Sequence, residues 1–496
     1  MNKSGVNGVS GLSSSLAQEA ASHSFRADSA RRPMMTGMQT LGVSRKAASQ
    51  GCPYHRMLLA QHRAAGESAG TVPLDQVVQT VRSHIDNPLK ALAELHEHHG
   101  KAFQTRTDTG VYRFDHDPAT ARQILVGSEG DDPAFKKSEQ QTHGLARALG
   151  RENLLLSSGD DWQSSRDALS DFFSTKGMRT EKRATEVTSI LDRHLDSVNA
   201  KLGEQGVGEV ELSGLFRRAT LDVALNTLFS TQATEKSLDK LLTSFEVLNK
   251  RVGQEWLLPA SVTGLEEPGA EQREATQTIT DWAGDLVERR AGQADQPEDA
   301  LTALMSAVDP DTGRPYSRER LVSEVKNLML AGHETTANLI TWTLTGLARN
   351  PIKQSGLFNQ IRETVGDSAP NLGQMRKLGP VYDLWRQEAT EHPPNFLLAR
   401  EAVRDTSIGP KENPVEIKAG TTVLVSTQHA NQEAKAMFSF GGGRRFCLGI
   451  NLARLETELA ITRFLQRFEL SDTGARGMDS GLTQLPEDTL VSVRRR

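Results

Sequence analysis

One short stretch near the C-terminus concentrates residues that could bind a metal. Residues 440–449 read FGGGRRFCLG and contain Cys447, one of only two cysteines in the 496 residues of the chain. A lone cysteine is either a small buried hydrophobe or a thiolate that reacts or binds a metal. The glycines favour a tight loop that approaches a flat ligand closely and aims backbone N–H groups at the sulfur. Cys447 is therefore a candidate metal ligand.

A second candidate site lies in the middle of a long predicted helix. Apolar residues recur at close to helical period over residues 317–351, with Ser317 placed to cap the start and Pro351 to end the helix. The middle of this segment, Ala331 to Thr336, reads AGHETT. Such polar groups in a buried helix indicate either a satisfied polar patch or kink, in which Thr bonds back to a preceding carbonyl, or a site of chemistry.

Both stretches match motifs of one enzyme family. Residues 440–449 follow the pattern F-x-x-G-x-R-x-C-x-G, the haem-binding signature of the cytochrome P-450 (haem-thiolate monooxygenase) family, and AGHETT resembles its oxygen-activation motif. The resemblance implies haem b, iron protoporphyrin IX, as cofactor, with Cys447 as the axial iron ligand. It also implies that Phe440 shields the sulfur, that Arg445 pairs with a haem propionate, and that Gly449 lets the following helix pass close to the porphyrin.

The same resemblance assigns roles within the long helix. It implies that Thr335 steadies the bound dioxygen and that Glu334 supplies protons through water, so both are candidate catalytic residues. Ala331 and Gly332 are expected beside the haem. Gly332 is also expected to loosen the backbone, so that a broken helical hydrogen bond opens a groove for dioxygen and water.

Two further segments resemble the family. Residues 150–173 resemble its third major helix, where Trp162 and Arg166 lie one turn apart on one face and both carry N–H donors suited to a propionate. The sequence PPNFLLAREA resembles the segment after helix K. There Arg400 is expected to hold a propionate and residues 394–398 to line the substrate pocket; the alternative for Arg400 is a solvated strand residue.

The chain departs from the family pattern at two places. Helix K of the family carries E-x-x-R before the Pro-Pro stretch, where this chain has Gln387 and Thr390; a shift by one residue gives Glu388 and Glu391, still without Arg. The family's meander, a few dozen residues before the haem loop, is replaced by the short stretch HANQEAKAMFSFGGG. Both losses remove one buried charge cluster, and losing the whole set costs less than losing part of it.

The elements that must position these residues are mostly helical. Residues 75–85 and 88–100 show helical spacing, and the second segment ends at a glycine suited to a helix C-terminus. Residues 102–118 alternate around Thr-Gly and predict a hairpin, and residues 396–427 predict a second β region. We expect a mainly α fold with a small β subdomain, the cytochrome P-450 fold, in a single large haem domain.

The resemblance places that haem domain at residues 71–496. Residues 1–70 are predicted to be a disordered or targeting tail, because the first 50 are rich in Ser, Ala, Gly and Arg and lack an apolar core segment. Cys52, at the edge of the tail, is expected to be incidental. Two cysteines cannot build a disulfide framework. The longest apolar runs are only a few residues, short of the ~20 that a membrane-spanning helix needs.

Composition and resemblance together predict the function. A net charge of −5 gives no nucleic-acid footprint. We expect a soluble, cytoplasmic, bacterial-type monooxygenase, or one exported or targeted through its tail. It would act with dioxygen on a small apolar molecule, using a separate ferredoxin or flavodoxin with its reductase, since no flavin or iron–sulfur domain follows. The alternatives are a degenerate haem-binding scaffold without turnover, and peroxide-driven or isomerase-type haem chemistry.

Overall fold

The computed structural model describes residues 70–128, 132–139, 142–472, 474 and 477–496. The predicted N-terminal tail, apart from Gly70, lies outside these residues, and so does Cys52. The described part is mainly helical with a small set of strands, as the sequence predicted.

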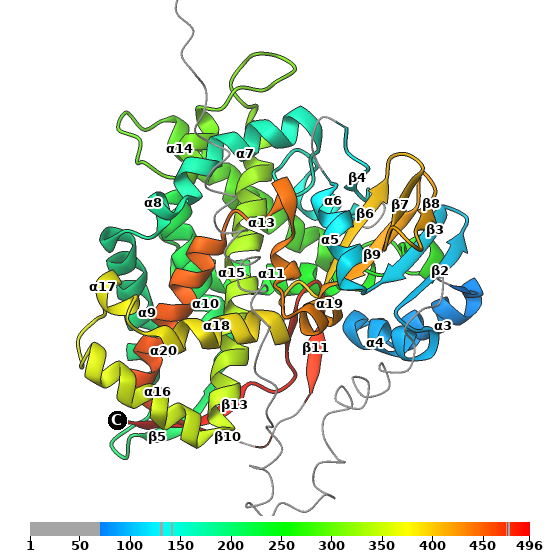
Figure 1. The fold of residues 1–496 in the computed structure, drawn as a ribbon. Coiled ribbons are helices and arrows are strands. Elements are labelled where there is room, and N and C mark those ends of the chain that lie inside the picture. Colours follow the sequence, from blue (N-terminus) through cyan, green and yellow to red (C-terminus); the bar gives the residue numbers. More distant parts are fainter. Residues whose placement is uncertain (1–69, 129–131, 140–141, 473, 475–476) are drawn as a thin grey trace, which may run out of the picture. The chain divides into compact units, whose positions relative to one another are not determined.

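One long helix, α15 (Arg318–Ala348), runs through the helical part, and α10, α13, α18 and α20 pack against it (Figure 1). Before it come α3 (Leu74–Ser83), α4 (Pro88–His99), α5 (Pro118–Val126), α6 (His143–Leu149), α7 (Gly159–Phe173), α8 (Thr175–Met178), α9 (Glu181–Lys201), α10 (Leu212–Phe229), α11 (Glu235–Gln254), α12 (Ala260–Thr263), α13 (Ala270–Ala291) and α14 (Ala300–Met305). After it come α16 (Pro351–Thr364), α17 (Leu372–Met375), α18 (Gly379–Glu391), α19 (Thr427–Ala434), the 3-10 turns η3 (Phe438–Phe440) and η4 (Gly443–Arg445), and α20 (Ile450–Arg467).

The strands form one larger sheet and three small ones. The larger sheet has the order β1-β2-β3-β9-β6-β4, from β1 (Gly70–Thr71), β2 (Ala102–Thr107), β3 (Gly110–Asp115), β9 (Thr422–Ser426), β6 (Leu397–Ala402) and β4 (Phe135–Lys137). The small sheets pair β10 (Phe468–Asp472), β13 (Leu490–Arg495) and β5 (Val207–Glu211); β11 (Met478–Ser480) and β12 (Gln484–Pro486); and β7 (Thr406–Ile408) and β8 (Val415–Ile417). The predicted hairpin is confirmed as the antiparallel pair β2–β3.

Helix α15 follows its sequence signals closely. The Ser317 side chain caps the start by accepting from the backbone N–H of Arg320 at 3.1 Å. The helix ends at Ala348, and Pro351 is the first residue of α16 rather than the last of α15. Its 31 residues give a length of about 46 Å, so it carries residues between distant parts of the fold.

Two hydrophobic clusters meet α15 on either side of its polar middle. One includes Val325 and Met329 from the first half of the helix, and the other includes Ile340 and Leu344 from the second half. No residue of the described segment 331–336 belongs to either cluster. The polar middle therefore lies at the break between two separately packed cores.

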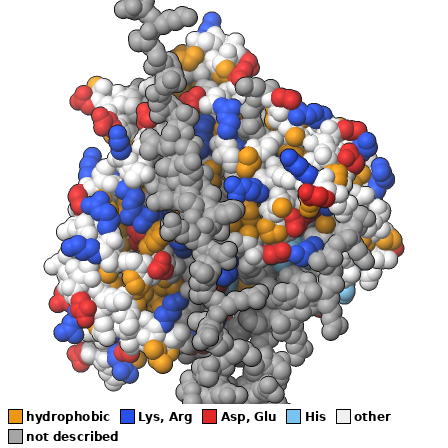
Figure 2. Space-filling view, in the orientation of Figure 1, with side chains coloured by type: hydrophobic (Ala, Val, Ile, Leu, Met, Phe, Trp, Pro, Cys, Tyr) orange, Lys and Arg blue, Asp and Glu red, His pale blue; other side chains and the backbone are white. Residues whose placement is uncertain are grey.

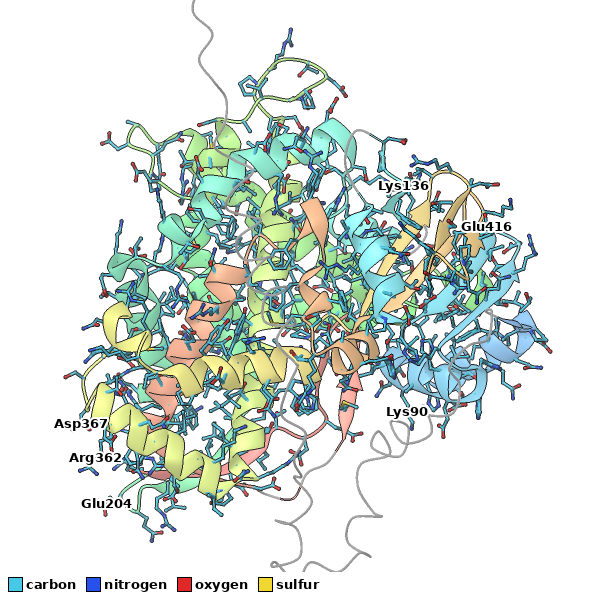
Figure 3. All side chains as sticks on the ribbon, viewed as in Figure 1. Lys90, Lys136, Glu204, Arg362, Asp367 and Glu416 are labelled. Carbon is cyan, nitrogen blue, oxygen red and sulfur yellow. The ribbon has the colours of Figure 1, made fainter. Side chains whose placement is uncertain are left out.

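The outer surface carries a mixture of charges. On the face seen in Figure 2, Lys and Arg side chains are interspersed with Asp and Glu outside the part that grey atoms cover. The labelled side chains in Figure 3 lie at the periphery, and Lys90, Glu204, Arg362, Asp367 and Glu416 are exposed. Among the described residues, no helix has both the length and the apolar character needed to cross a membrane.

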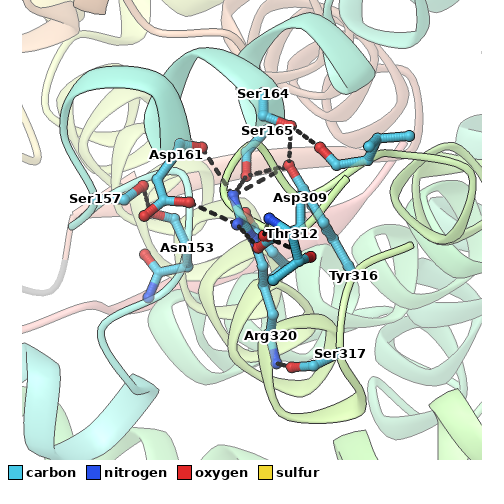
Figure 4. Close-up of polar contacts among 12 residues, drawn as sticks. Asn153, Ser157, Asp161, Ser164, Ser165, Asp309, Thr312, Tyr316, Ser317 and Arg320 are labelled. Carbon is cyan, nitrogen blue, oxygen red and sulfur yellow. Dashed lines mark hydrogen bonds and ion pairs between the residues drawn. The ribbon is translucent and has the colours of Figure 1, made fainter. Parts of the chain in front are cut away.

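Arg320, at the start of α15, is a buried exception to this surface placement of charge (Figure 4). Its guanidinium donates to the carboxylates of Asp161 at 2.7 Å and Asp309 at 2.9 Å, and to the Asp161 carbonyl at 2.9 Å. It also donates to the hydroxyls of Ser165 at 3.3 Å and Tyr316 at 3.1 Å. Because Asp161 and Ser165 belong to α7, this one side chain ties α7 to the start of α15.

We expect Arg320→Met to lower the free energy of unfolding by about 2–3 kcal/mol, because it removes several charge-assisted hydrogen bonds from a buried site. The matched control is Arg318→Met, two residues away, whose side chain is 51% exposed and pairs with Glu288 at the surface. That change should cost about 0.5 kcal/mol or less. Urea unfolding of the purified proteins measures both; equal losses for the two variants would contradict the assignment.

Candidate active site

A cavity of about 300 Å³ lies against the polar middle of α15, and apolar side chains form most of its wall. All eleven residues that the sequence analysis proposed as catalytic or cofactor-binding line it: Trp162, Arg166, Ala331, Gly332, Glu334, Thr335, Arg400, Phe440, Arg445, Cys447 and Gly449. From the predicted pocket segment 394–398, the residues that line it are Pro394, Asn395 and Leu398. The structure thus brings two motifs that are far apart in the sequence to one site.

The glycines of the cysteine loop serve both a turn and a close contact. Gly441 and Gly443 have positive φ values of 79° and 59°, which glycine adopts at little cost. A Cβ on Gly443 would lie 2.9 Å from the Cα of Val126 in α5, and a Cβ on Gly442 3.1 Å from the Cβ of Leu125. The backbone of the loop therefore packs directly on α5 and leaves no room for a side chain. This is a second reason why glycine is required here.

The Cys447 sulfur lies just before the N-terminus of α20. The backbone N–H groups of Gly449 and Ile450 bond to this sulfur, and the Cys447 N–H itself donates to the Phe440 carbonyl at 2.7 Å. Burial raises the pKa of the Cys447 thiol, while the Gly449 N–H, the charge of Arg166 and the Ile450 N–H act against that rise. A sulfur held by N–H donors at a cavity wall is suited to bind a metal as thiolate.

Helix α7 contributes a cation and an aromatic ring beside the loop. Arg166 donates to the Phe446 carbonyl at 2.7 Å, next to the cysteine. Arg445 donates to the Ser157 carbonyl, and its guanidinium carbon lies 4.8 Å from the centre of the Trp162 ring. The predicted neighbours Trp162 and Arg166 therefore both contact the cysteine loop, one through its ring and the other through a hydrogen bond.

Arg400 reaches the cavity from the sheet. It lies on β6, is only 2% exposed, and donates to the Ser128 hydroxyl at 2.8 Å and to the Ala399 carbonyl at 2.8 Å. The alternative interpretation of Arg400 as a solvated strand residue is therefore wrong, because the side chain turns inward beneath the sheet.

Glu334 is a buried acid in the polar middle of α15. Its Oε1 lies 3.7 Å from Nη2 of Arg217 on α10, and its Oε2 accepts no hydrogen bond from the described residues. Burial raises the pKa of Glu334; the charge of Arg217 and the side chains of Asn249 and Thr483 oppose this rise. The side chain of Arg217 is 20% exposed, so the pair leads from the cavity wall towards solvent.

Gly332 differs from expectation. Helix α15 continues through it without interruption, and the Thr335 hydroxyl donates to the Ala331 carbonyl at 2.9 Å. A Cβ on Gly332 would lie 3.3 Å from the Cβ of Ala224 and 3.5 Å from Cδ1 of Leu228, both on α10. The glycine therefore permits close packing of α10 on α15.

The first departure from the family pattern, at Gln387 and Thr390, corresponds to polar contacts near the surface of α18. On α18, Gln387 accepts from Nζ of Lys353 at 3.0 Å, and the Thr390 hydroxyl bonds back to the Arg386 carbonyl at 2.8 Å. Neither position supplies a charge to the interior. The structure thus contains polar surface contacts where the family pattern has its Glu and Arg.

The short connection before the cysteine loop forms helix α19 and is anchored at several points. The side chains of Gln428 and Gln432 both donate to the Glu391 carbonyl at 3.3 Å, which joins α19 to the end of α18. The backbone N–H of Phe438 donates to the Asn431 side chain at 2.5 Å. These contacts are a brace for the loop that the sequence analysis did not identify.

Three buried histidines pack together beneath α19. The ring centres of His96, His116 and His429 lie 4.6, 5.0 and 5.4 Å apart, and Nδ1 of His429 bonds to the Ser426 hydroxyl at 2.6 Å. Burial, with repulsion from the neighbouring histidines, lowers the pKa of His96 to about 4 and that of His429 to about 3. The pKa of His116 is lowered as well, for the same reasons. At neutral pH the cluster is therefore uncharged.

Some cavity residues were missed by sequence reasoning. Asn327 lies on α15 one turn before Ala331, so helical spacing from the motif would have found it. Trp256 and Thr483 also line the cavity, but they lie in loops without any motif. Their positions follow from tertiary packing and carry no local signal.

The donor set fits haem. One cysteine sulfur, held by two N–H groups, and three guanidinium groups, from Arg166, Arg400 and Arg445, line a mainly apolar cavity. A porphyrin needs an apolar environment for its ring, an axial ligand for its iron and cationic donors for its two carboxylates. The residues present supply each of these.

Comparison with known proteins gives a consistent result. A model of the cytochrome P-450 family matches residues 72–436 and 426–486. The chain is 26% identical over 404 residues to a Mycobacterium tuberculosis protein named as a cytochrome P-450, covering 73% of this chain and 84% of that protein. It is 25% identical to a cytokinin hydroxylase of Arabidopsis thaliana, covering 68% and 70% of the two chains.

A third relative is named cyclooctat-9-en-7-ol 5-monooxygenase and comes from Streptomyces melanosporofaciens. It is 24% identical over 435 residues, which cover 82% of this chain and 89% of that protein.

The histidine cluster predicts loss of stability in acid. The ordinary histidine pKa is 6.5, so below that pH the unfolded chain binds protons that the folded protein does not. The free energy of unfolding therefore falls as pH drops towards about 4. In His116→Phe one titrating group is gone, and the loss between pH 7 and 4.5 should be smaller by about 2 kcal/mol. Denaturant unfolding across this pH range measures it, with the exposed neighbour His98→Phe as control; parallel curves for all three proteins would refute the prediction.

Proposed function

Because the chain belongs to the cytochrome P-450 family, we propose that it is a haem-thiolate monooxygenase that oxidises a small, largely apolar molecule. It uses dioxygen and electrons from a separate redox protein, such as a ferredoxin or flavodoxin with its reductase. The observation that carries this proposal is the convergence of the cysteine loop and the polar middle of α15 on one mainly apolar cavity. We assign the haem domain to residues 71–496 and a tail, disordered or used for targeting, to residues 1–70.

Cys447 would hold the iron of haem b, and the two N–H groups at its sulfur would moderate the donor strength of the thiolate. Haem b bound in this way supplies the activation of dioxygen. Arg166, Arg400 and Arg445, with Trp162, would hold the propionates, and Phe440 would keep water from the sulfur. Ala331, Gly332 and Gly449 would form the walls nearest the ring.

Proton supply would depend on Glu334 and Thr335. Burial raises the pKa of Glu334 and so favours its protonated, proton-donating form, and its neighbour Arg217 reaches towards solvent. The Thr335 hydroxyl lies at the cavity, and among the described residues its one bond is within its own helix, to the Ala331 carbonyl. It can therefore turn and donate to an oxygen atom in the cavity. Together these groups would carry protons from the surface to the reacting oxygen.

The relatives support the reaction type rather than one substrate. Two of them are named for hydroxylation or monooxygenation, one acting on a cytokinin and one on a cyclic alcohol. A Bacillus subtilis relative, 23% identical, is named as a bifunctional cytochrome P-450 and reductase, and the match covers 40% of its length. That relative therefore carries its reductase in the same chain, whereas we propose a separate redox partner here.

A second candidate function is haem binding without monooxygenase turnover. Gln387 and Thr390 on α18, together with the short connection through α19, favour it, because the charge cluster that braces the loop in the family is absent from these positions. Peroxide-driven or isomerase-type chemistry would use the same cavity with less need of Glu334 and Thr335. The contacts of α19 with α18 and the presence of both residues favour the first candidate.

We expect the purified protein, reduced and treated with carbon monoxide, to show the red-shifted Soret band of a thiolate-bound haem. Cys447→Ser should lack this band, because a serine oxygen does not replace the thiolate. A wild-type band like that of a histidine-bound haem, or no haem, would overturn the proposal. A thiolate band without substrate turnover would instead support the second candidate function.

Thr335→Ala should keep the haem content but release several-fold more hydrogen peroxide per NAD(P)H consumed in a reconstituted system, because a proton donor is lost from the cavity. The matched control is Thr343→Ala, which removes the same kind of hydroxyl, bonded to the Leu339 carbonyl at 2.8 Å, from a buried part of the same helix. Peroxide yields that match wild type in both variants would rule out the role given to Thr335.

A further inference from the structure

We propose that the substrate is an apolar alcohol whose hydroxyl group is bound by Asn327, with the indole N–H of Trp256 as a second hydrogen-bonding group. This inference rests on the proposed function, because it takes the cavity to be the substrate site. It goes beyond it by assigning the chemical class of the substrate and the residues that recognise its polar group.

Two side chains in the cavity wall each carry a buried polar atom that makes no hydrogen bond within the described part of the chain. Asn327 is 3% exposed and Trp256 is 7% exposed, and both line the cavity. Neither the Asn327 side-chain oxygen nor the Trp256 indole nitrogen makes a hydrogen bond within the described part of the chain. A buried polar atom without a partner costs free energy, so such atoms at a binding cavity indicate a ligand that satisfies them.

The chemistry of this pair selects a hydroxyl group. The indole N–H only donates, whereas the amide of Asn327 accepts through its oxygen and donates through its nitrogen. The Asn327 amide also hydrogen-bonds the Glu324 side chain, which leaves the amide oxygen to be satisfied. A hydroxyl group donates to that oxygen, and the hydroxyl oxygen accepts from an indole N–H. A carboxylate or an ether cannot donate to the Asn327 oxygen, and an alkane satisfies neither atom.

The distance between Asn327 and Thr335 indicates the length of the substrate. Asn327 and Thr335 lie on the same helix and line the same cavity, eight residues apart. The helical rise places them about 12 Å apart along the axis, roughly the length of ten bonded carbons. Between them the wall includes the apolar residues Leu328, Leu330 and Ala331, and Glu334 lies next to Thr335 at the far end. An alcohol of about this length would have its hydroxyl at Asn327 and its far end near Thr335, where oxidation is proposed.

The test uses three probes with one carbon skeleton: decan-1-ol, its methyl ether 1-methoxydecane, and decane. Isothermal titration calorimetry of each probe with the full-length, haem-loaded protein measures the dissociation constants. We expect the wild type to bind the alcohol more tightly than the ether, and the ether more tightly than decane, by about three- to tenfold at each step.

The variants separate the two contacts. Asn327→Leu, which is of similar shape, should reduce the affinity for the alcohol to that for the ether. Trp256→Phe should reduce the affinity for the ether to that for decane. Trp342→Phe is the matched control, because its indole nitrogen is also buried without a hydrogen bond from the described residues but lies outside the cavity lining; it should behave as wild type.

Equal binding of the three probes to the wild type, or an alcohol preference that persists in Asn327→Leu, would overturn the inference. Decane affinity reports whether a variant keeps its cavity, and the wild-type ranking tests the proposal even if a variant does not fold. The carbon monoxide spectrum of the same preparation tests separately whether the protein binds haem through a thiolate, as the proposed function requires. A thiolate band with no alcohol preference therefore rejects this inference alone.

Discussion

Polar groups cannot be enclosed in an apolar core without partners, and this requirement determines where the cavity of this protein lies. Helix α15 carries six consecutive residues, 331–336, through the interior, and two hydrophobic clusters end on either side of them. The cavity lies at this break. Glu334 and Thr335 are thus held at a wall where a ligand and protons can reach them, while the halves of the same helix are fixed by packing.

The cysteine loop meets this helix across the cavity because other elements position it tightly. Its glycines rest on the backbone of α5, Arg166 bonds to the Phe446 carbonyl, and α20 starts immediately after the sulfur. Arg166 lies on α7, and α7 is tied to α15 by the buried Arg320. Helix α7 therefore connects the helix that carries Thr335 to the loop that carries Cys447, through charge-assisted bonds at two separate points.

The sequence predicted those features of the fold and the site that depend on residues close together in the chain. The motif at residues 440–449 and the AGHETT segment predicted the family, and the one-turn spacing of Trp162 and Arg166 predicted their shared face. It could not predict contacts that depend on the packing of distant elements. Gly332 is one example, because its role against Ala224 and Leu228 requires knowing that α10 crosses α15 there. Trp256 is another, since its loop has no pattern and reaches the cavity only in the folded chain.

The missing charge cluster shows how the interior adapts when a family feature is lost. A single remaining charge beneath the loop would be costly, and none of the described contacts of Gln387 or Thr390 leaves one there. On its inner side α19 is anchored by neutral groups: glutamines that bond to the Glu391 carbonyl, and His429 within a histidine cluster that is uncharged at neutral pH. The ion pair that α19 makes, between Glu433 and Lys101, is partly exposed to solvent. Neutral hydrogen bonds are individually weaker than the ion pairs they replace, but they carry no desolvation cost for a charge. The loop can therefore be held in place by a shorter connection, with its stability now dependent on the histidines remaining unprotonated.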